Sequence, residues 1–204
     1  HTELCGDAYL DLYEAGKLTN RRKSFQRGKG VAGIILGTQR LYDWVDRNPG
    51  VVVEPLEFIN DPAVIARNDR MISINSCVSA DLYGQVGAES AGLRHISGTG
   101  GQLDYLTGAA MSRGGAAFIC MTSSFVTQTG ERRSRIVPHF CGDIVTDPRS
   151  QAYFIVTEYG AVNLAGASAW ERAERLISIA HPDFRDELVA AARKQNIWRA
   201  SAKR

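Results

Sequence analysis

The sequence predicts an α/β fold with a largely parallel sheet flanked by helices, and three observations support it. Short β-branched and aliphatic runs bounded by glycine or proline alternate with segments of helical periodicity. The run at 116–121 is continuously apolar, which is typical of a central strand buried on both faces. The length of 204 residues is enough to bury a sizeable core. Strands that alternate with helices favour βαβ units.

In the first half of the chain, the patterns predict short elements punctuated by glycine, proline and capping residues. In order, we expect a helix at 8–18 weakened by Gly16, a strand at 31–36, a helix capped by Thr38, a strand or extended segment at 51–59, a helix starting at Pro62 with Asp61 as cap, and a strand at 71–78.

The second half continues the alternation. We expect an alternating stretch at 79–87, a helix at 103–112, a central strand at 116–121, strands at 134–140 and 152–160 around a turn at 147–149, and helices at 168–180 and 184–196. Ser168 and Glu171 have the spacing of a capping box. The buried stripe of the first C-terminal helix is predicted to be Trp170, Ala173, Leu176 and Ile177.

Charge and composition exclude several classes of protein. The net charge of +2, with scattered basic residues, gives neither a nucleic-acid footprint nor a membrane-surface patch. No run of about 20 apolar residues predicts a membrane span, so we expect a cytoplasmic protein. The cysteines and histidines are dispersed without metal-ligand spacing, so no metal site is expected. Cys77 and Cys120 lie in apolar runs and are expected to be buried thiols.

A glycine-rich loop at 97–104, Ser-Gly-Thr-Gly-Gly-Gln-Leu-Asp, precedes a helical pattern. Such a loop can present backbone N–H groups to an anion at a helix start. The dinucleotide fingerprint fails, because the third glycine and the acidic residue about 20 positions later are both missing. A phosphate-binding Walker loop fails because no Gly-Lys-Ser/Thr follows. An oxyanion formed at an acyl carbonyl remains, beside the alternative of an ordinary tight turn.

Several short motifs together resemble the acetyl-CoA hydrolase/transferase family, whose members include 4-hydroxybutyrate and butyryl-CoA:acetate CoA-transferases. The motifs are His-Thr-Glu at 1–3, Ile-Asn-Ser at 74–76, Asp-Leu-Tyr-Gly-Gln at 81–85, Gly-Thr-Gly-Gly-Gln-Leu-Asp at 98–104, Ser-Arg-Ile-Val-Pro at 134–138, Asp-Pro-Arg at 147–149, Val-Thr-Glu-Tyr-Gly at 156–160 and Ala-His-Pro-Asp-Phe-Arg at 180–185. The resemblance extends over almost the whole chain and implies a CoA-transferase-like domain over 1–204. It corresponds to the C-terminal half of the family.

The resemblance implies that Glu3 is the nucleophile. In the family this carboxylate attacks an acyl-CoA thioester, and a mixed anhydride and then a glutamyl-CoA thioester follow. The resemblance places the oxyanion donor in the glycine-rich loop, with the Gly101 amide favoured over that of Gly100. Here the implied role agrees with the helix-start geometry predicted from the residues.

Other site residues are expected on the same resemblance, each with a structural alternative. Asn60 corresponds to a family asparagine near the thioester, but it also precedes a predicted helix. Gly98, Gln102, Asp104 and Asn75 are candidate contacts for CoA or the acyl group. Asp104 could instead serve the helix N-terminus.

Three further polar residues are expected to be structural. Glu158 is expected to make an internal salt bridge or a backbone contact ahead of any functional role. His139 and His181 are expected to be structural, because the family's reaction needs no imidazole.

The resemblance also implies the partners. We expect acyl-CoA and a small carboxylate as substrates, no permanently bound cofactor, and a homodimer or homotetramer. The chain opens at His1 without Met, and the family's N-terminal half is expected as a further partner because it faces this one. Two alternatives stay open: a hydrolase, in which water replaces the acceptor carboxylate, and a CoA-binding half that is inactive alone.

Overall fold

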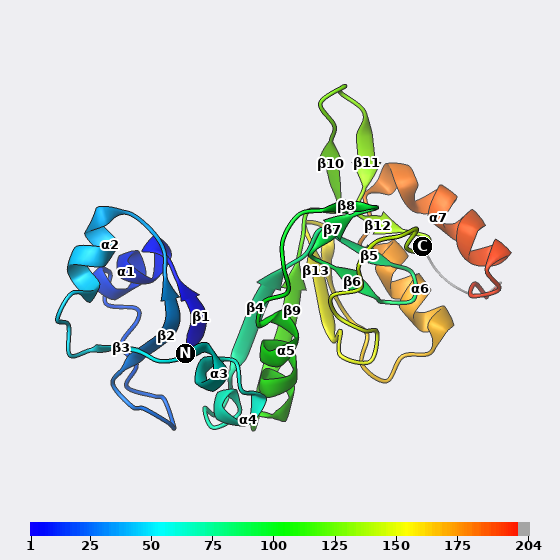
Figure 1. Ribbon diagram of the computed structural model, residues 1–204. Helices are drawn as coiled ribbons and strands as arrows, with labels where there is room; N and C mark the ends of the chain where they lie inside the picture. The colour runs from blue at the N-terminus through cyan, green and yellow to red at the C-terminus, as the bar shows by residue number, and fades with distance from the viewer. Residues whose placement is uncertain (200–204) are drawn as a thin grey trace. The chain divides into compact units, whose positions relative to one another are not determined.

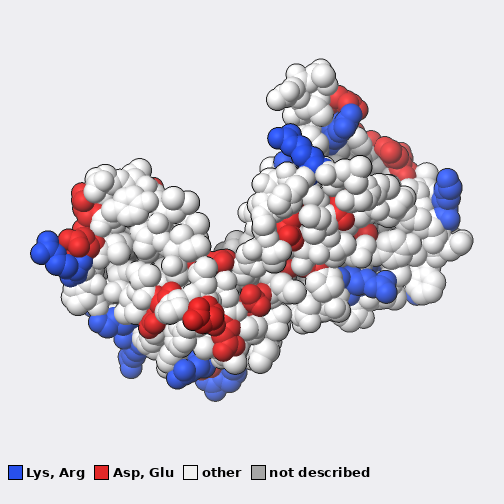
Figure 2. All heavy atoms as spheres, in the orientation of Figure 1, with Lys and Arg blue, Asp and Glu red and all other residues white. Residues whose placement is uncertain are grey.

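The computed structural model describes residues 1–199, which form parts of two compact units. Unit one comprises His1–Met71 and Thr107–Ala116, and unit two comprises Ile72–Leu106 and the chain from Ala117 onward. Among the described residues, no helix has both the length and the apolar character needed to cross a membrane. On the face drawn in Figure 2, Lys and Arg are interspersed with Asp and Glu, as the near-balanced charge predicts.

Unit one contains a parallel three-stranded sheet in the order β1-β2-β3, coloured blue to cyan in Figure 1. Its strands are β1 (Thr2–Cys5), β2 (Gly30–Ile35) and β3 (Val51–Val53), and α1 (Asp7–Glu14) and α2 (Gln39–Val45) connect them. The core includes Cys5, Leu10, Ala32 and Leu41, with Trp44 packed against it. These two βαβ connections confirm the predicted α/β class.

Three predictions for unit one need correction. The first helix ends at Glu14 rather than 18, because Gly16 adopts a left-handed φ of 68°. Thr38 precedes α2 as predicted, but its hydroxyl donates to Asp7 Oδ1 at 2.7 Å instead of capping the helix.

The expected extended segment at 51–59 divides into β3 and a short helix, α3 (Leu56–Ile59), because Pro55 occupies the N-cap and starts a helical turn. The next helix, α4 (Pro62–Ile65), begins as predicted. The Asp61 side chain accepts a hydrogen bond from the Ala63 amide at 2.8 Å and so caps it.

Unit two contains a four-stranded sheet in the order β14-β13-β9-β4. The strands are β4 (Ile72–Ser76), β9 (Ala116–Cys120), β13 (Phe154–Thr157) and β14 (Gly160–Asn163). β9 lies inside the sheet and runs parallel to β13, which confirms its predicted central position. The expected strand at 152–160 is shorter, because Gly160 pairs with Thr157 across a tight turn and starts the antiparallel β14.

A smaller sheet and two hairpins complete the strands of unit two (Figure 1). The sheet has the order β12-β5-β6, and the hairpins are β7-β8 and β10-β11. Their bounds are β5 (Ser79–Asp81), β6 (Val86–Gly87), β7 (Ser90–Ala91), β8 (Arg94–His95), β10 (Ser124–Val126), β11 (Arg132–Ser134) and β12 (Ile136–Val137). The predicted strand at 134–140 is therefore divided between β11 and β12, and antiparallel hairpins accompany the parallel pairs.

The three helices in the second half of the chain follow the predictions closely. They are α5 (Gln102–Met111), α6 (Ala169–Ser178) and α7 (Pro182–Lys194). The capping box of Ser168 and Glu171 is present at the start of α6. Ala173, Leu176 and Ile177 are buried as expected, but Trp170 remains 41% exposed in the first turn, where the Arg199 guanidinium lies 4.9 Å from its ring centroid.

The four cysteines are free thiols, and their burial differs from the prediction. Cys77 and Cys120 are only partly buried, because one follows the last residue of β4 and the other is the last residue of β9. Strand ends are less completely covered than strand centres, so the apolar runs around these thiols overestimated their burial.

Candidate active site

Glu3 and Asn60 meet in unit one although 57 positions separate them. Glu3 lies in β1 with a half-buried side chain, and its Oε1 accepts a hydrogen bond of 3.0 Å from Asn60 Nδ2. A carboxylate only accepts hydrogen bonds, so the amide nitrogen must be the group that faces it. Asn60 follows α3, and its backbone N–H donates to the Leu56 carbonyl at 2.8 Å. The structure therefore brings together two of the residues predicted for the site.

Gly33 in β2 has no side chain, and this allows the contact between Asn60 and Glu3. An added Cβ at Gly33 would lie 2.5 Å from Leu56 Cδ2 and 3.5 Å from Ile59 Cγ1, so α3 packs directly against the backbone of β2. A side chain at Gly33 would force the Leu56 side chain, or α3 itself, to shift. The close approach of α3 sets the point from which Asn60 reaches Glu3.

The glycine-rich loop lies in unit two and leads into α5 as predicted. Residues 97–100 are exposed and Gly101 is buried; the Gly101 carbonyl accepts a hydrogen bond from the Tyr105 amide at 2.9 Å. Gly98, Gly100 and Gly101 do not adopt positive φ. A Cβ on Gly98 would meet no atom within 4 Å. Left-handed backbone is therefore not the reason for these glycines.

Hydrogen bonds to two acidic side chains hold the residues that flank Gly100 and Gly101. Thr99 Oγ1 donates to Glu89 Oε1 at 2.8 Å, and Gln102 Nε2 donates to Asp147 Oδ2 at 2.6 Å. Glu89 is 8% exposed and Asp147 is fully buried. Asp147 was predicted to be a turn residue. Its backbone instead forms a β-bridge with Val86, which carries its carboxyl inside unit two.

The two carboxyl groups differ in their electrostatics. Burial raises the pKa of Asp147 to about 6; the hydrogen bond from Gln102 opposes this shift and the charge of Glu89 adds to it. Hydrogen bonds from the Thr99 and Thr146 hydroxyls lower the pKa of Glu89. Within residues 1–199, the Asp147 Oδ1 is a buried oxygen without a hydrogen-bond partner. Sequence reasoning missed both acids, because neither has a recognisable spacing to the loop.

The other predicted residues make local contacts. Asn75 lies in β4 and donates to Ser73 Oγ at 2.8 Å, while Asp104 lies in the first turn of α5. Glu158 accepts hydrogen bonds from the Ser123 amide at 2.8 Å and hydroxyl at 2.6 Å. Desolvation alone would raise the pKa of Glu158, but the Ser123 bonds outweigh it and lower that pKa.

Two histidines contact structural neighbours. His181 Nδ1 accepts from the Asp183 amide at the start of α7, at 3.3 Å. His139 Nδ1 lies 3.2 Å from Gln195 Nε2. Among the described residues, no group of three or more His, Cys, Asp and Glu side chains could hold a metal ion.

Comparison with known proteins decides the family. Residues 37–192 match the acetyl-CoA hydrolase/transferase C-terminal domain. The chain belongs to the acetyl-CoA hydrolase/transferase family. Over its whole length it is 53% identical to a probable butyrate:acetyl-CoA coenzyme A-transferase from Syntrophomonas wolfei, and it covers 45% of that protein. It is likewise 49% identical over its whole length to a butyryl-CoA:acetate CoA-transferase from Anaerostipes caccae, of which it covers 46%.

A solved structure agrees. The crystal structure of RipA from Yersinia pestis superimposes with a TM-score of 0.89 at 42% identity, covering 97% of this chain and 44% of RipA. The chain thus spans about half the length of the curated relatives it matches. The mixed α/β fold predicted from the sequence is confirmed.

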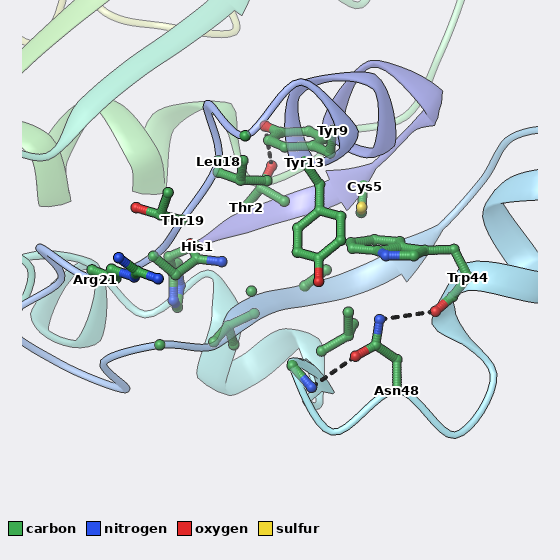
Figure 3. A pocket seen from close by; sticks show the side chains of 18 residues that line it. His1, Thr2, Cys5, Tyr9, Tyr13, Leu18, Thr19, Arg21, Trp44 and Asn48 are labelled. Carbon is green, nitrogen blue, oxygen red and sulfur yellow. Dashed lines mark hydrogen bonds between the residues drawn. The ribbon is translucent and has the colours of Figure 1, made fainter.

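Unit one of this family member also contains a cavity of about 360 Å³ (Figure 3). Tyr9 and Tyr13 from α1 and Trp44 from α2 line it, and the rings of Tyr13 and Trp44 lie 5.1 Å apart. Asn48 braces one wall, since its Nδ2 donates to the Trp44 carbonyl and its Oδ1 accepts from the Gly50 amide. None of the residues predicted for the site is among the residues that line this cavity.

A second cavity, of about 670 Å³, lies in unit two. Arg133, Arg135, Phe125 and Ile96 are among the residues that line it. The Arg135 guanidinium lies 4.9 Å from the Phe125 ring centroid and donates to the Val78 carbonyl at 2.9 Å. The cavity therefore combines cations with an aromatic ring, and its lining includes Ile96, which directly precedes the glycine-rich loop in the sequence.

Proposed function

We propose that the protein to which this chain belongs is a CoA-transferase that exchanges CoA between an acyl-CoA and a short-chain carboxylate, with Glu3 as the nucleophile. The observation that carries the proposal is the hydrogen bond from Asn60 to the half-buried Glu3 carboxylate in β1. The two transferases that match this chain over its whole length support it, because their names describe exchange of CoA between butyrate and acetate.

The reaction runs through two covalent intermediates. One Glu3 oxygen attacks the thioester carbonyl, the C–S bond breaks, and CoA leaves as a thiolate from a mixed anhydride. The thiolate then attacks the glutamyl carbonyl, which releases the first carboxylate and leaves a glutamyl-CoA thioester. The acceptor carboxylate repeats these steps in reverse, so that CoA leaves on the new acyl group and the Glu3 carboxylate is restored.

Asn60 acts at the oxygen that does not bond to the acyl group. Its Nδ2 donates to Oε1, which holds the carboxylate in one orientation before attack. Once the other oxygen is acylated, Oε1 is a carbonyl oxygen and becomes negatively charged when the thiolate adds. A donor already placed at Oε1 stabilises that charge, an effect worth about 3 kcal/mol at a good oxyanion site.

The amides of Gly101 and Gly100 are proposed as donors to the oxyanion on the acyl carbon. Their position immediately before the ten-residue helix α5 supports this role, because a helix N-terminus favours negative charge. Gly98, Gln102, Asp104 and Asn75 are proposed contacts for CoA or the acyl group. Gln102 and Asp104 lie in the first turn of α5.

The cavity of unit two is proposed to hold the nucleotide end of CoA. That part of CoA carries phosphates and a purine ring. Arg133 and Arg135 offer charge for phosphate, and Phe125 offers a face for stacking. The cavity includes Ile96, which precedes the glycine-rich loop by one residue, so the thioester end of the same molecule would extend toward the loop amides.

The partners follow from the length comparison. The curated relatives are about twice as long as this chain, so we propose that an N-terminal half completes the enzyme and that the chain alone is inactive. A homodimer or homotetramer is proposed by resemblance. No permanently bound cofactor is needed, because CoA enters and leaves as a substrate.

Isotope partition in the full-length protein tests the reaction. The protein is incubated with butyryl-CoA and ¹³C-acetate, and labelled acetyl-CoA is measured against free CoA. A transferase gives labelled acetyl-CoA in equal amount to the butyryl-CoA consumed. If free CoA accumulates instead, the family's hydrolase activity is the function and water is the acceptor.

A further inference from the structure

Two buried acids bracket the part of the glycine-rich loop that carries the proposed donors. Glu89 binds Thr99, the residue before Gly100, and Asp147 binds Gln102, the residue after Gly101. Backbone hydrogen bonds also tie the start of the loop to Glu89. The Glu89 carbonyl accepts hydrogen bonds from the Ile96 amide at 2.8 Å and the Ser97 amide at 3.2 Å. We name Glu89 and Asp147 the loop clamp.

Burying the acids of the loop clamp destabilises the folded state. A buried carboxylate loses its hydration and is tolerated only where hydrogen bonds replace water. Asp147 is fully buried, yet within residues 1–199 its Oδ1 has no hydrogen-bond partner. Its other oxygen makes one short bond to Gln102, at 2.6 Å. An apolar residue at this position would avoid the cost, so core packing does not explain the acid.

We propose that Glu89 and Asp147 are positioning residues, which fix Thr99 and Gln102 so that the amides of Gly100 and Gly101 keep one orientation. Hydrogen bonds to ionised acceptors are about twice as strong as neutral ones, which suits them to hold an otherwise exposed loop. Glycine gives the loop high conformational entropy, which would otherwise oppose a fixed donor geometry. The effect on catalysis rests on the proposed function; the effect on the loop does not.

The clamp depends on pH through Asp147. Its pKa is raised to about 6 by burial, so it protonates in mildly acidic solution. The Glu89 carboxylate adds to this shift, and Asp147 in turn acts on the neighbouring Cys77 thiol, whose own pKa is raised to about 12, mainly by burial. Cys77 stays neutral across the range that matters. Protonation converts the charged acceptor of Gln102 into a neutral one, so the loop loosens below pH 6.

Hydrogen exchange and kinetics on the full-length protein test the clamp. In Asp147→Leu we expect amide exchange at 97–104 to rise about 10-fold. We expect kcat to fall about 10-fold while KM for acyl-CoA changes less than threefold, because donor geometry acts on the transition state. Asp147→Asn keeps an acceptor and removes the charge, so the fall in kcat below pH 6 should disappear.

Two further variants keep the test decisive. Asp43→Leu is the matched control, because Asp43 accepts from Gln39 at 2.8 Å in the same type of pair on an exposed surface, and exchange and kcat should not change. If Asp147→Leu does not fold, Thr99→Val removes the other contact from an exposed position, and the same two effects are expected.

Three outcomes are distinguishable. Unchanged exchange and kcat in Asp147→Leu and Thr99→Val would overturn the clamp, and faster exchange with unchanged kcat would overturn its role in positioning. Loop exchange in the substrate-free protein does not depend on Glu3. A failure of Glu3 to form a thioester, with exchange still sensitive to Asp147, would therefore remove the proposed function and leave the clamp.

Discussion

The two units hold their candidate groups in opposite ways. In unit one, a neutral amide contacts a half-buried carboxylate, and the glycine at position 33 makes that contact possible. In unit two, two buried acids hold a loop whose own residues are largely exposed. A nucleophile must keep its basicity, and a neutral donor such as the Asn60 amide lowers that basicity less than a cation would. Backbone donors must not move, so stronger anchors are needed.

Removing the proposed nucleophile in unit one should have the largest effect on activity. We expect Glu3→Gln to lower kcat of the full-length protein by about 1,000-fold or more, because an amide cannot form the anhydride. Glu57→Gln is the control, since Glu57 is exposed in the first turn of α3 and lies near in sequence to Asn60. Steady-state transfer of CoA from butyryl-CoA to acetate is the measurement. Retention of a tenth of the activity in Glu3→Gln would contradict the assignment.

Removing the amide partner should have the next largest effect. Asn60→Ala is expected to lower kcat about 100-fold, the size seen for loss of one oxyanion donor, with little change in KM. Single-turnover formation of the glutamyl-CoA thioester measures the step directly. An unchanged rate of thioester formation would mean that the contact at 3.0 Å is only structural.

A subtler change tests whether backbone packing places Asn60. Gly33→Ala would put a methyl group 2.5 Å from Leu56 Cδ2, so the Leu56 side chain or α3 must shift. We expect kcat to fall about 10-fold and the free energy of unfolding to fall by about 1–3 kcal/mol. Gly30→Ala is the control, because Gly30 lies in the same strand and its Cβ would come no closer than 3.6 Å to a neighbouring atom. A loss of stability in Gly33→Ala without loss of kcat would separate packing from positioning.

A substitution in the cavity of unit two should weaken the binding of acyl-CoA. Arg135→Gln is expected to raise KM for acyl-CoA about fivefold to 10-fold and leave kcat within twofold, since one desolvated charged hydrogen bond to a remote phosphate contributes equally to ground and transition states. Initial rates at varied butyryl-CoA concentration test this. A fall in kcat with unchanged KM would place Arg135 at the reacting groups instead.

The smallest effect concerns stability against pH. The folded pKa of Asp147, about 6, lies above its usual value of 3.8, so the unfolded chain loses this proton first as pH rises. The stability linked to Asp147 is therefore present below pH 4 and lost between pH 4 and 6. Asp147→Asn should raise the free energy of unfolding by about 1–3 kcal/mol at pH 8 and by little at pH 4. An equal effect at both pH values would contradict the burial argument.

Local patterns predicted the elements that local interactions determine. The capping box of Ser168, the Asp61 cap, the central strand β9 and the start of α5 after the glycine-rich loop all agree with the structure. In each case neighbouring residues in the sequence supply the stabilising contact.

Several element bounds were wrong for local reasons, at Gly16, Pro55 and Gly160, but the wrong predictions of contacts involve partners far away in the chain. Thr38 binds Asp7 rather than its own helix, and Asp147, expected in a turn, is buried beside Gln102. The approach of Asn60 to Glu3 depends on the missing side chain of Gly33. Periodicity and spacing do not report such contacts, because they are decided by how distant segments pack inside each unit. The roles of individual site residues remain proposals.

Borohydride trapping at Glu3 tests the central claim most directly. The full-length protein is incubated with butyryl-CoA and sodium borohydride, which reduces a glutamyl-CoA thioester to an alcohol, and peptides are analysed by mass spectrometry. The account predicts a mass loss localised to Glu3 that requires butyryl-CoA and is absent in Glu3→Gln. Turnover of butyryl-CoA with Glu3 left unmodified would contradict it, because the carboxylate would then not be the nucleophile.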